Sequence, residues 1–321
     1  MDPNPNPPSV EGRNWAELSP DVLSVIFGKI GAVEILMGAG RVCRGWRRVA
    51  REPLLWRRVD MTHLDHLGEA EMEAMARLAV DWSAGRMEEF SAARFGSDEL
   101  LLYIAERANL LKSLCLVSCY DISDEGLTEM VKRFPCLEKL EIIFGSFTMK
   151  LCESVGQACP QLKLFKLNTK GSYYMSDDEE ELDNTDDCDA LGIAKTMHEL
   201  RQLQLFGNKV TNEGLKAILD SCPHLESLDI RRCFNLNMDA SMKAMCSRIR
   251  NLRLPEDSAD DYEYDAAVGP FDEDDDDDIF SENSEFDDMM YDNDYDYDYI
   301  DYDYQHGIGD DDDHLNLFFL L

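Results

Sequence analysis

The sequence predicts an α/β protein in three parts: a small N-terminal helical module, an open solenoid of about seven strand–helix repeats, and a disordered acidic tail. Three observations lead to this prediction. A tryptophan-containing segment has apolar residues at helical spacing, the pattern L-x-x-L-x-L recurs at nearly constant intervals, and the acidic residues are concentrated in two blocks. We expect a disordered N-terminus over 1–13, the helical module over 14–61, the repeats over 62–255 with an acidic insert at 176–189, and the tail over 256–321.

The helical module begins with a well-marked first helix. Pro20 suits a first-turn position, and Asp21 favours the positive end of the helix dipole. The apolar residues of this helix cover more than one face, so we expect some of them to meet a second surface; they are Val22, Leu23, Val25, Ile26, Phe27 and Ile30. Further helices are expected over Glu34–Met37 and Val42–Val49, before Pro53 ends the third.

The repeat region contains seven copies of L-x-x-L-x-L, some with substituted apolar residues. Their intervals are 24, 26, 25, 38, 25 and 24 residues, and the copies start at Met87, Leu111, Leu137, Leu162, Leu200, Leu225 and Ile249. The long interval contains Asp177–Asp189, and without these 13 residues it would be 25. Each unit predicts a short strand followed by a helix, and stacking is required because one unit cannot bury its own apolar face. We expect helices at Glu69–Val80, Asp124–Phe134, Leu151–Ala158 and Asn212–Ser221.

The net charge of −35 comes from the two acidic blocks. Residues 256–321 hold 27 of the 66 acidic residues and no lysine or arginine, and Asp177–Asp189 hold another 9. The remaining chain has 30 acidic residues against 31 basic ones, so the folded body is close to neutral. A segment of mutually repelling carboxylates with few aliphatic residues cannot form a packed core, and this composition predicts disorder for the tail.

Several function classes lack support in the sequence. The ten cysteines are scattered without a CxxC pair and the six histidines are dispersed, so we expect no metal site. No Gly-rich phosphate loop or nucleophile elbow is present, which argues against an enzyme. No apolar run reaches membrane-spanning length, and we expect a soluble protein of the nucleus or cytoplasm with no direct nucleic-acid or membrane partner.

The N-terminal module resembles an F-box. The resemblance rests on the Leu18/Pro20 start, on Val42-Cys43-x-x-Trp46-Arg47 and on Leu55-Trp56-Arg57, although Ser19 separates two residues that are adjacent in many F-boxes. It implies docking onto a Skp-type adaptor, which links to cullin and RING subunits. The implied adaptor-binding residues, some of them expected to be internal core, are Leu18, Pro20, Leu23, Ile26, Phe27, Ile30, Val42, Cys43, Trp46, Leu55 and Trp56.

The repeats resemble the cysteine-containing leucine-rich repeats that are common in F-box proteins. Residues 118–127 (SCYDISDEGL) and 207–215 (GNKVTNEGL) are close to the turn-into-helix pattern of that class. Together with the module, the chain resembles plant-type F-box/leucine-rich-repeat proteins. This resemblance implies a non-catalytic substrate-recognition subunit of an SCF-type E3 ubiquitin ligase. Nothing indicates the inositol-phosphate pocket of larger relatives, so we expect no cofactor.

A protein substrate is expected on the face of the sheet formed by the residues between the leucines, because these side chains alternate with the core. The candidates are Lys112, Lys139, Lys163, Lys166, Arg201, Gln204, Asp229, Arg250 and Arg253. Aromatic anchors are expected on the following loops at Phe144, Phe147, Phe206 and Phe234.

Three interpretations of the acidic tail remain open. It could bind a basic protein such as a histone, fold back over the arginines of 41–58 or the lysines of the sheet, or serve as a solubilising extension. The first interpretation also defines an alternative function, a chromatin- or histone-binding acidic leucine-rich-repeat protein with no ligase role.

Overall fold

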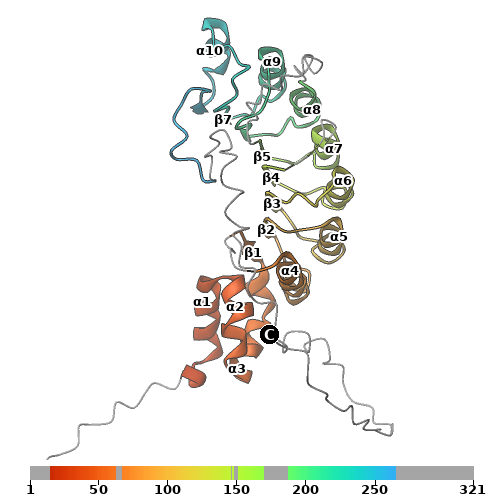
Figure 1. Ribbon diagram of the computed structural model, residues 1–321, viewed down its shortest axis with the longest axis vertical. Coiled ribbons are helices and arrows are strands. Elements are labelled where there is room, and N and C mark those ends of the chain that lie inside the picture. The colour runs from red at the N-terminus through yellow and green to blue at the C-terminus, as the bar shows by residue number, and fades with distance from the viewer. Residues whose placement is uncertain (1–14, 63–66, 146, 148–150, 170–186, 265–321) are drawn as a thin grey trace, which may run out of the picture. The chain divides into compact units, whose positions relative to one another are not determined.

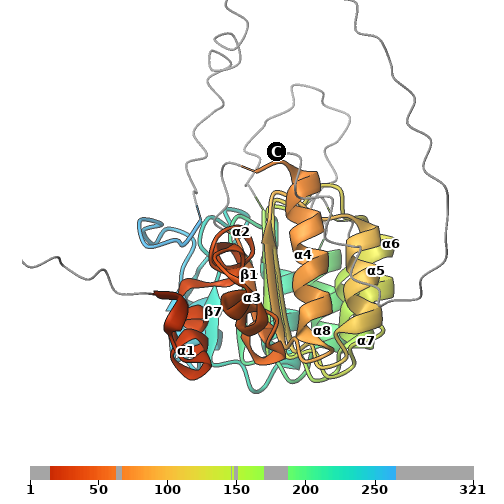
Figure 2. The same ribbon diagram turned by 90° about the horizontal axis from the view of Figure 1, so that it is seen from below.

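The structure is a computed structural model that describes residues 15–62, 67–145, 147, 151–169 and 187–264. The predicted disordered N-terminus, most of the acidic insert and the tail after residue 264 lie outside the described residues. The described part contains one parallel sheet of eight strands that follow each other in chain order. Helices cover one face of this sheet (Figures 1 and 2), and the predicted fold class is confirmed.

The helical module consists of three α-helices and three short 3₁₀ turns. The α-helices are α1 (Pro20–Ile30), α2 (Ala32–Met37) and α3 (Arg44–Ala50), and the turns are η1 (Trp15–Glu17), η2 (Ala39–Arg41) and η3 (Pro53–Trp56). Ser19 caps α1, because its hydroxyl accepts from the Val22 N–H at 3.4 Å. Gly31 separates α1 from α2 with φ of +95°, a conformation that glycine adopts readily.

Trp56 joins this module to the repeats. Its side chain is fully buried, and its Nε1 donates to the carbonyl oxygen of Ala50 at 2.7 Å. The Trp56 ring meets the ring of Trp82 edge to face, with centroids 5.2 Å apart. Trp82 belongs to α4 (Glu69–Ser83), and β1 (Arg58–Met61) pairs with the next strand of the sheet. The last four residues of the segment predicted as the helical module are therefore the first strand of the solenoid.

Seven further strands correspond to the seven predicted copies of the repeat pattern. They are β2 (Glu89–Ala93), β3 (Ser113–Val117), β4 (Lys139–Ile143), β5 (Leu164–Asn168), β6 (Gln202–Gln204), β7 (Ser227–Asp229) and β8 (Asn251–Arg253). The register places the second apolar residue of each pattern beside the next one, in the order Phe90, Leu114, Leu140, Phe165, Leu203, Leu228 and Leu252. This ladder forms the core between strands and helices.

The helices after α4 stack in the same order as the strands. They are α5 (Asp98–Arg107), α6 (Asp124–Val131), α7 (Leu151–Ala158), α8 (Cys188–Thr196), α9 (Asn212–Ser221) and α10 (Ala240–Cys246). Two of them have the predicted bounds, α7 and α9. The two other predicted helices differ slightly from their predicted bounds, since α4 continues to Ser83 and α6 ends at Val131. After α6 the chain tightens into a turn in which the Phe134 N–H donates to the Val131 carbonyl. No bounds were predicted for α5, α8 and α10.

Buried thiols connect successive repeats. Cys119 and Cys233 lie just after β3 and β7, and their thiols donate to the carbonyls of Ala92 and Leu205 in the preceding repeat, at 3.7 and 2.8 Å. Burial raises the pKa of the Cys233 thiol to about 12, so the group stays protonated and remains a donor.

Two acidic blocks begin or end differently from the prediction. The insert was expected to run through residue 189, but α8 begins at Cys188 and Asp187 caps the following repeat, with its carboxylate accepting from the Thr211 N–H at 2.8 Å. The tail was expected to be disordered from Glu256. Residues 256–264 instead lie on the open face of the sheet, the face without helices, because their side chains find specific partners there.

Candidate functional site

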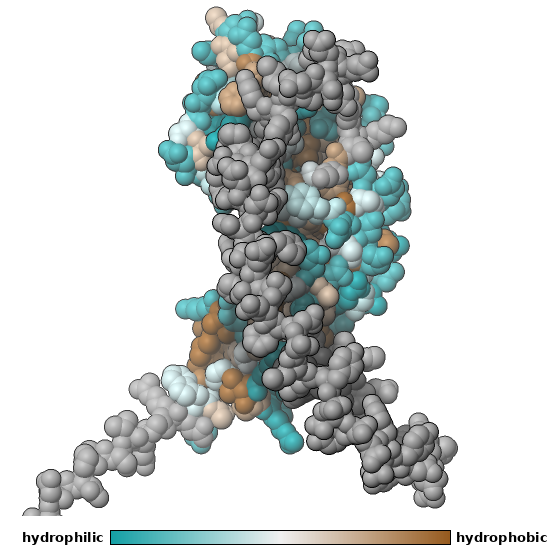
Figure 3. Space-filling view, in the orientation of Figure 1, coloured by the Kyte–Doolittle hydropathy of each residue, from teal (hydrophilic) through white to brown (hydrophobic). Residues whose placement is uncertain are grey.

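Two surfaces of the described chain are candidates for protein binding. The first lies on α1, where the apolar residues divide between two faces as predicted. Leu23 and Phe27, four residues apart, are 2% and 0% exposed and form the module core. Val22 and Val25 point the other way and are 46% and 62% exposed. An apolar surface is visible over α1 in Figure 3.

The structure divides the predicted adaptor-binding residues into three groups. Buried in the core are Leu23, Phe27 and Trp56; half-buried are Leu18, Ile26, Cys43, Trp46 and Leu55; exposed are Pro20, Ile30 and Val42. Trp46 is fixed by its Nε1, which donates to the Trp15 carbonyl at 3.2 Å, and by an edge-on contact with the Phe27 ring. The buried residues form the core of the module, and the residues of the other two groups lie at least partly on its surface.

Five exposed apolar side chains of the module were absent from the predicted set: Trp15, Val22, Val25, Met37 and Leu54. A helical-wheel argument could have found the two valines. At about 100° per residue, Val25 lies about 160° from both Leu23 and Phe27 on the helical wheel, and Val22 lies about 100° and 140° from them.

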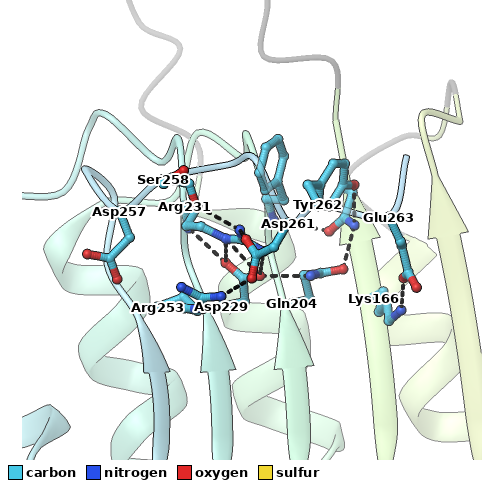
Figure 4. A network of polar contacts seen from close by, with 12 residues as sticks. Lys166, Gln204, Asp229, Arg231, Arg253, Asp257, Ser258, Asp261, Tyr262 and Glu263 are labelled. Atoms are coloured by element: carbon cyan, nitrogen blue, oxygen red, sulfur yellow. Dashed lines mark hydrogen bonds and ion pairs between the residues drawn. The ribbon is translucent and has the colours of Figure 1, made fainter. Parts of the chain in front are cut away.

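The second surface is the open face of the sheet, and the crossing segment (residues 256–264) lies over it. This segment follows β8 and runs towards β3 (Figure 4). Asp257 accepts from the Leu254 N–H at 2.8 Å and turns the chain. Asp261 then forms ion pairs with Arg231, at 2.6 Å, and with Arg253.

Tyr262 is the central anchor of the crossing segment. Its ring stacks on Phe206, with centroids 3.9 Å apart and planes 11° from parallel. Its hydroxyl accepts from Asn168 Nδ2 at 2.8 Å. Asn168 is 1% exposed and also bonds Gln204 and the Phe206 N–H, so its amide is held before any partner arrives.

The last two residues of the crossing segment reach the middle of the sheet. Glu263 pairs with Lys166, which also pairs with Glu141 at 2.7 Å. Burial lowers the pKa of Lys166, but the hydrogen bonds to the two carboxylates outweigh burial and the net shift is upward. The Tyr264 hydroxyl lies 3.8 Å from Cys115 Sγ, and its ring meets Phe144 edge to face.

A buried ion pair fixes the orientation of Arg231 at this surface. Arg231 and Asp229 are 4% and 9% exposed, and the guanidinium binds the carboxylate through Nε and Nη2 at 3.0 and 2.7 Å. Burial raises the pKa of Asp229, but hydrogen bonds from Arg231 and Gln204 outweigh it, so the pKa lies below its usual range. Arg231 is thereby fixed with Nη1 directed at the Ser258 carbonyl and Asp261.

The predicted substrate-binding residues fall into separate groups on this face. Lys166, Gln204, Asp229 and Arg253 converge on the network of Figure 4. A second group pairs with glutamates of neighbouring repeats where the strands begin: Lys112 with Glu88, Lys163 with Glu138 and Arg201 with Glu226. Lys139 and Arg250 are exposed and lie outside the drawn network.

Apart from the crossing segment itself, two central residues of the network were not predicted, Asn168 and Arg231. Each directly follows the last apolar residue of its repeat pattern, where the two preceding repeats of β5 have Val117 and Ile143. A polar residue at a position that is apolar in other repeats was the available signal. The predicted anchors Phe144 and Phe206 do contact aromatic rings, but the rings belong to the protein's own Tyr262 and Tyr264.

Comparison with known proteins identifies both parts of the described chain. A family model described as F-box-like matches residues 15–62, and a Leucine Rich repeat model matches residues 197–219. Putative F-box/LRR-repeat protein 22 of Arabidopsis thaliana is 45% identical over 255 residues, 78% of this chain and 80% of that protein. The chain belongs to the F-box/LRR-repeat family. F-box protein SKIP19 of the same plant is 42% identical over 254 residues, again 78% and 80% of the two chains.

The matched part of the chain spans about half the length of another relative. Putative F-box/LRR-repeat protein 23 of Arabidopsis thaliana is 43% identical over 251 residues, but the match spans 55% of that protein. The matched F-box region, residues 15–62, includes β1 and so extends into the sheet. Among the described helices, none combines the length and apolar composition needed to cross a membrane.

Proposed function

We propose that this F-box/LRR-repeat protein is the substrate-recognition subunit of an SCF-type E3 ubiquitin ligase. Its F-box docks onto a Skp-type adaptor, which connects it to cullin and RING subunits, and the open face of the sheet holds a protein substrate. The protein itself is not catalytic and supplies proximity between the substrate and the enzymes of the complex.

The division of α1 is the observation that carries the adaptor part of this proposal. Leu23 and Phe27 already satisfy the core, so Val22 and Val25 are not needed for folding. Burying a valine side chain against a partner contributes roughly 1.5–3 kcal/mol, and clustered exposed apolar residues mark interaction sites. Ile30, Met37 and Val42 add exposed apolar surface to the same module, at 37%, 45% and 57% exposure.

Co-purification with a Skp-type adaptor tests the proposal. We expect the wild type to bind and the double variant Val22→Asp/Val25→Asp to lose at least about 10-fold in affinity, equivalent to about 1.4 kcal/mol. Because both positions are exposed, the variant should keep the wild-type melting temperature.

The matched control is Leu191→Asp, which places the same charge on an apolar residue of α8 that is 53% exposed. It should bind the adaptor as the wild type does. Absence of adaptor binding by the wild type would refute the ligase role.

The described residues give no support to the chromatin-binding alternative. Two of the acidic side chains near the start of the predicted tail, Asp261 and Glu263, pair with the protein's own Arg231, Arg253 and Lys166. A nuclear or cytoplasmic location stays a prediction.

A further inference from the structure

The crossing segment is attached to the sheet through its side chains. Residues 261–264 are Asp-Tyr-Glu-Tyr, and each of the four side chains has its own partners on the open face. Charged groups meet Arg231, Arg253 and Lys166, and the rings between them meet Phe206 and Phe144. Within the described chain, no backbone hydrogen bond joins these four residues to a strand.

This mode of attachment determines what else could bind. Backbone pairing would accept almost any extended segment, whereas side-chain contacts select a sequence. Another segment with alternating acidic residues and tyrosines could make the same contacts. The surface does not depend on residues 261–264 for its organisation, because Asn168 is held by Gln204, Arg231 by Asp229 and Lys166 by Glu141. Such preorganised groups lose little freedom when a ligand binds.

The contacts of the crossing segment also allow a competing segment to displace it. Asp261 and Glu263 have side chains that are each 55% exposed, so their ion pairs are screened by solvent. Residue 261 follows the end of β8 by eight positions, and this short tether gives residues 261–264 a high effective concentration at the site. A competing segment must therefore bind well or be present at high concentration.

We propose that the open face is a binding site for acidic tyrosine-containing segments of the pattern Asp-Tyr-[Asp/Glu]-Tyr, that a substrate protein carries such a segment, and that residues 261–264 occupy the site in the free protein. The role of the bound protein as a substrate rests on the proposed ligase function, whereas the existence of the binding site does not depend on that function. The sequence contains the same pattern again at Asp294–Tyr297, Asp296–Tyr299 and Asp301–Tyr304.

Fluorescence anisotropy with a labelled peptide of residues 257–264 tests this proposal on the full chain. The variant Tyr262→Ala/Tyr264→Ala removes the ring contacts of the chain's own segment. We expect it to bind the peptide at least about 10-fold more tightly than the wild type, because a site that is free in one molecule of ten weakens the apparent affinity tenfold. A peptide with both tyrosines replaced by alanine should not bind.

Charge variants in the Tyr262→Ala/Tyr264→Ala background locate the site. Lys166→Glu with Arg253→Glu should abolish peptide binding. The control Lys163→Glu makes the same change on the same repeat and should bind normally. Lys163 pairs with Glu138 and lies outside the network that the described residues of the crossing segment form.

Two outcomes show which segment of the chain occupies the open face. If the double variant fails to bind the peptide, the five tyrosines between residues 295 and 304 are also replaced by alanine. Binding that appears then supports the recognition chemistry and identifies the later copies as the occupant. Binding that is still absent, in a variant with the wild-type melting temperature, overturns the proposal.

The peptide assay needs no adaptor, and the adaptor assay does not use the open face. Peptide binding without adaptor binding would leave this site standing and remove the ligase role. Adaptor binding without peptide binding would support the ligase role and remove this binding site.

Discussion

At the scale of single residues, the ion pair of Asp229 and Arg231 combines burial with a functional position. Two charges taken out of water are tolerated because the carboxylate receives two bonds from one guanidinium and another from Gln204 at 2.8 Å. The same geometry holds Arg231 towards Asp261. Stability and ligand binding therefore depend on the same residue.

Removing the carboxylate should be costly. We expect Asp229→Ala to lower the free energy of unfolding by about 3 kcal/mol, the lower end of the range for breaking a buried pair, because Arg231 keeps Asp261 and the Ser258 carbonyl. Urea denaturation measures this change. Glu226→Ala is the control on the neighbouring exposed pair with Arg201 and should cost less than about 1 kcal/mol. Equal costs would contradict the assigned role.

The pH dependence of stability follows from the lowered pKa of Asp229. A carboxylate whose folded pKa is depressed stabilises the fold fully above its unfolded pKa of about 3.9, and this stabilisation is lost as pH falls through the lower folded value. We expect wild-type stability to fall more steeply below about pH 4 than that of Asp229→Asn. Urea midpoints at pH 6, 4 and 3 compare the two slopes, and parallel slopes would exclude the contribution.

At the scale of elements, acidic residues at helix starts connect two pairs of successive repeats. Asp98, in the first turn of α5, accepts from the N–H and hydroxyl of Ser123 at 2.9 and 2.6 Å, and Ser123 in turn caps α6. Asp187 does the same for Thr211 before α9. A Cβ at Gly126 or Gly214 would lie 1.9 or 2.3 Å from these carboxylates, which explains the glycines of the two Glu-Gly-Leu sequences.

Loss of the Asp98 carboxylate should weaken the stacking of α5 and α6. We expect Asp98→Ala to lower the free energy of unfolding by about 1–3 kcal/mol, the usual cost of hydrogen-bond donors that lose a charged acceptor. Thermal or urea unfolding measures it. Glu99→Ala removes the same charge from the same first turn at an exposed position, and it should have a smaller effect. If both variants lose the same amount, the helix dipole explains the result and the inter-repeat bond does not.

At the scale of the described molecule, Trp56 and Trp82 couple the F-box to the first repeat. The contact buries Trp56 completely, and β1 continues the sheet directly after it. We therefore expect the F-box and the repeats to unfold in one transition. All four tryptophans lie between residues 15 and 82, so tryptophan fluorescence reports on this junction while far-UV circular dichroism also reports on the later helices.

Trp56→Ala should uncouple the unfolding of the F-box from the unfolding of the repeats. We expect a loss of about 3–5 kcal/mol, as for other buried tryptophans, and fluorescence and circular dichroism midpoints that no longer coincide. Trp15→Ala is the control, because Trp15 is 58% exposed and its contact with Trp46 uses the backbone carbonyl. A wild type with two separate transitions would contradict the coupling.

The sequence by itself determined the repeat architecture, the strand register and the family. Leucine spacing carries this information because the inward apolar positions of one repeat must match those of the next, from Phe90 to Leu252. It also identified Lys166, Gln204, Asp229 and Arg253 on one face, since side chains alternate along a strand. It missed Asn168 and Arg231, whose polar nature is visible but whose burial is not.

A helical wheel separates the two apolar faces of α1, but tertiary structure alone decided which of these faces is buried and where residues 256–264 lie. Acidic composition predicts disorder from average properties, yet Tyr262 binds Asn168 from 94 positions away and Tyr264 reaches Cys115 from 149 positions away. No local pattern encodes such contacts, because they depend on the stacking of strands that brings Phe206, Asn168 and Arg231 together. The free energy that orders an acidic segment comes from this assembled surface.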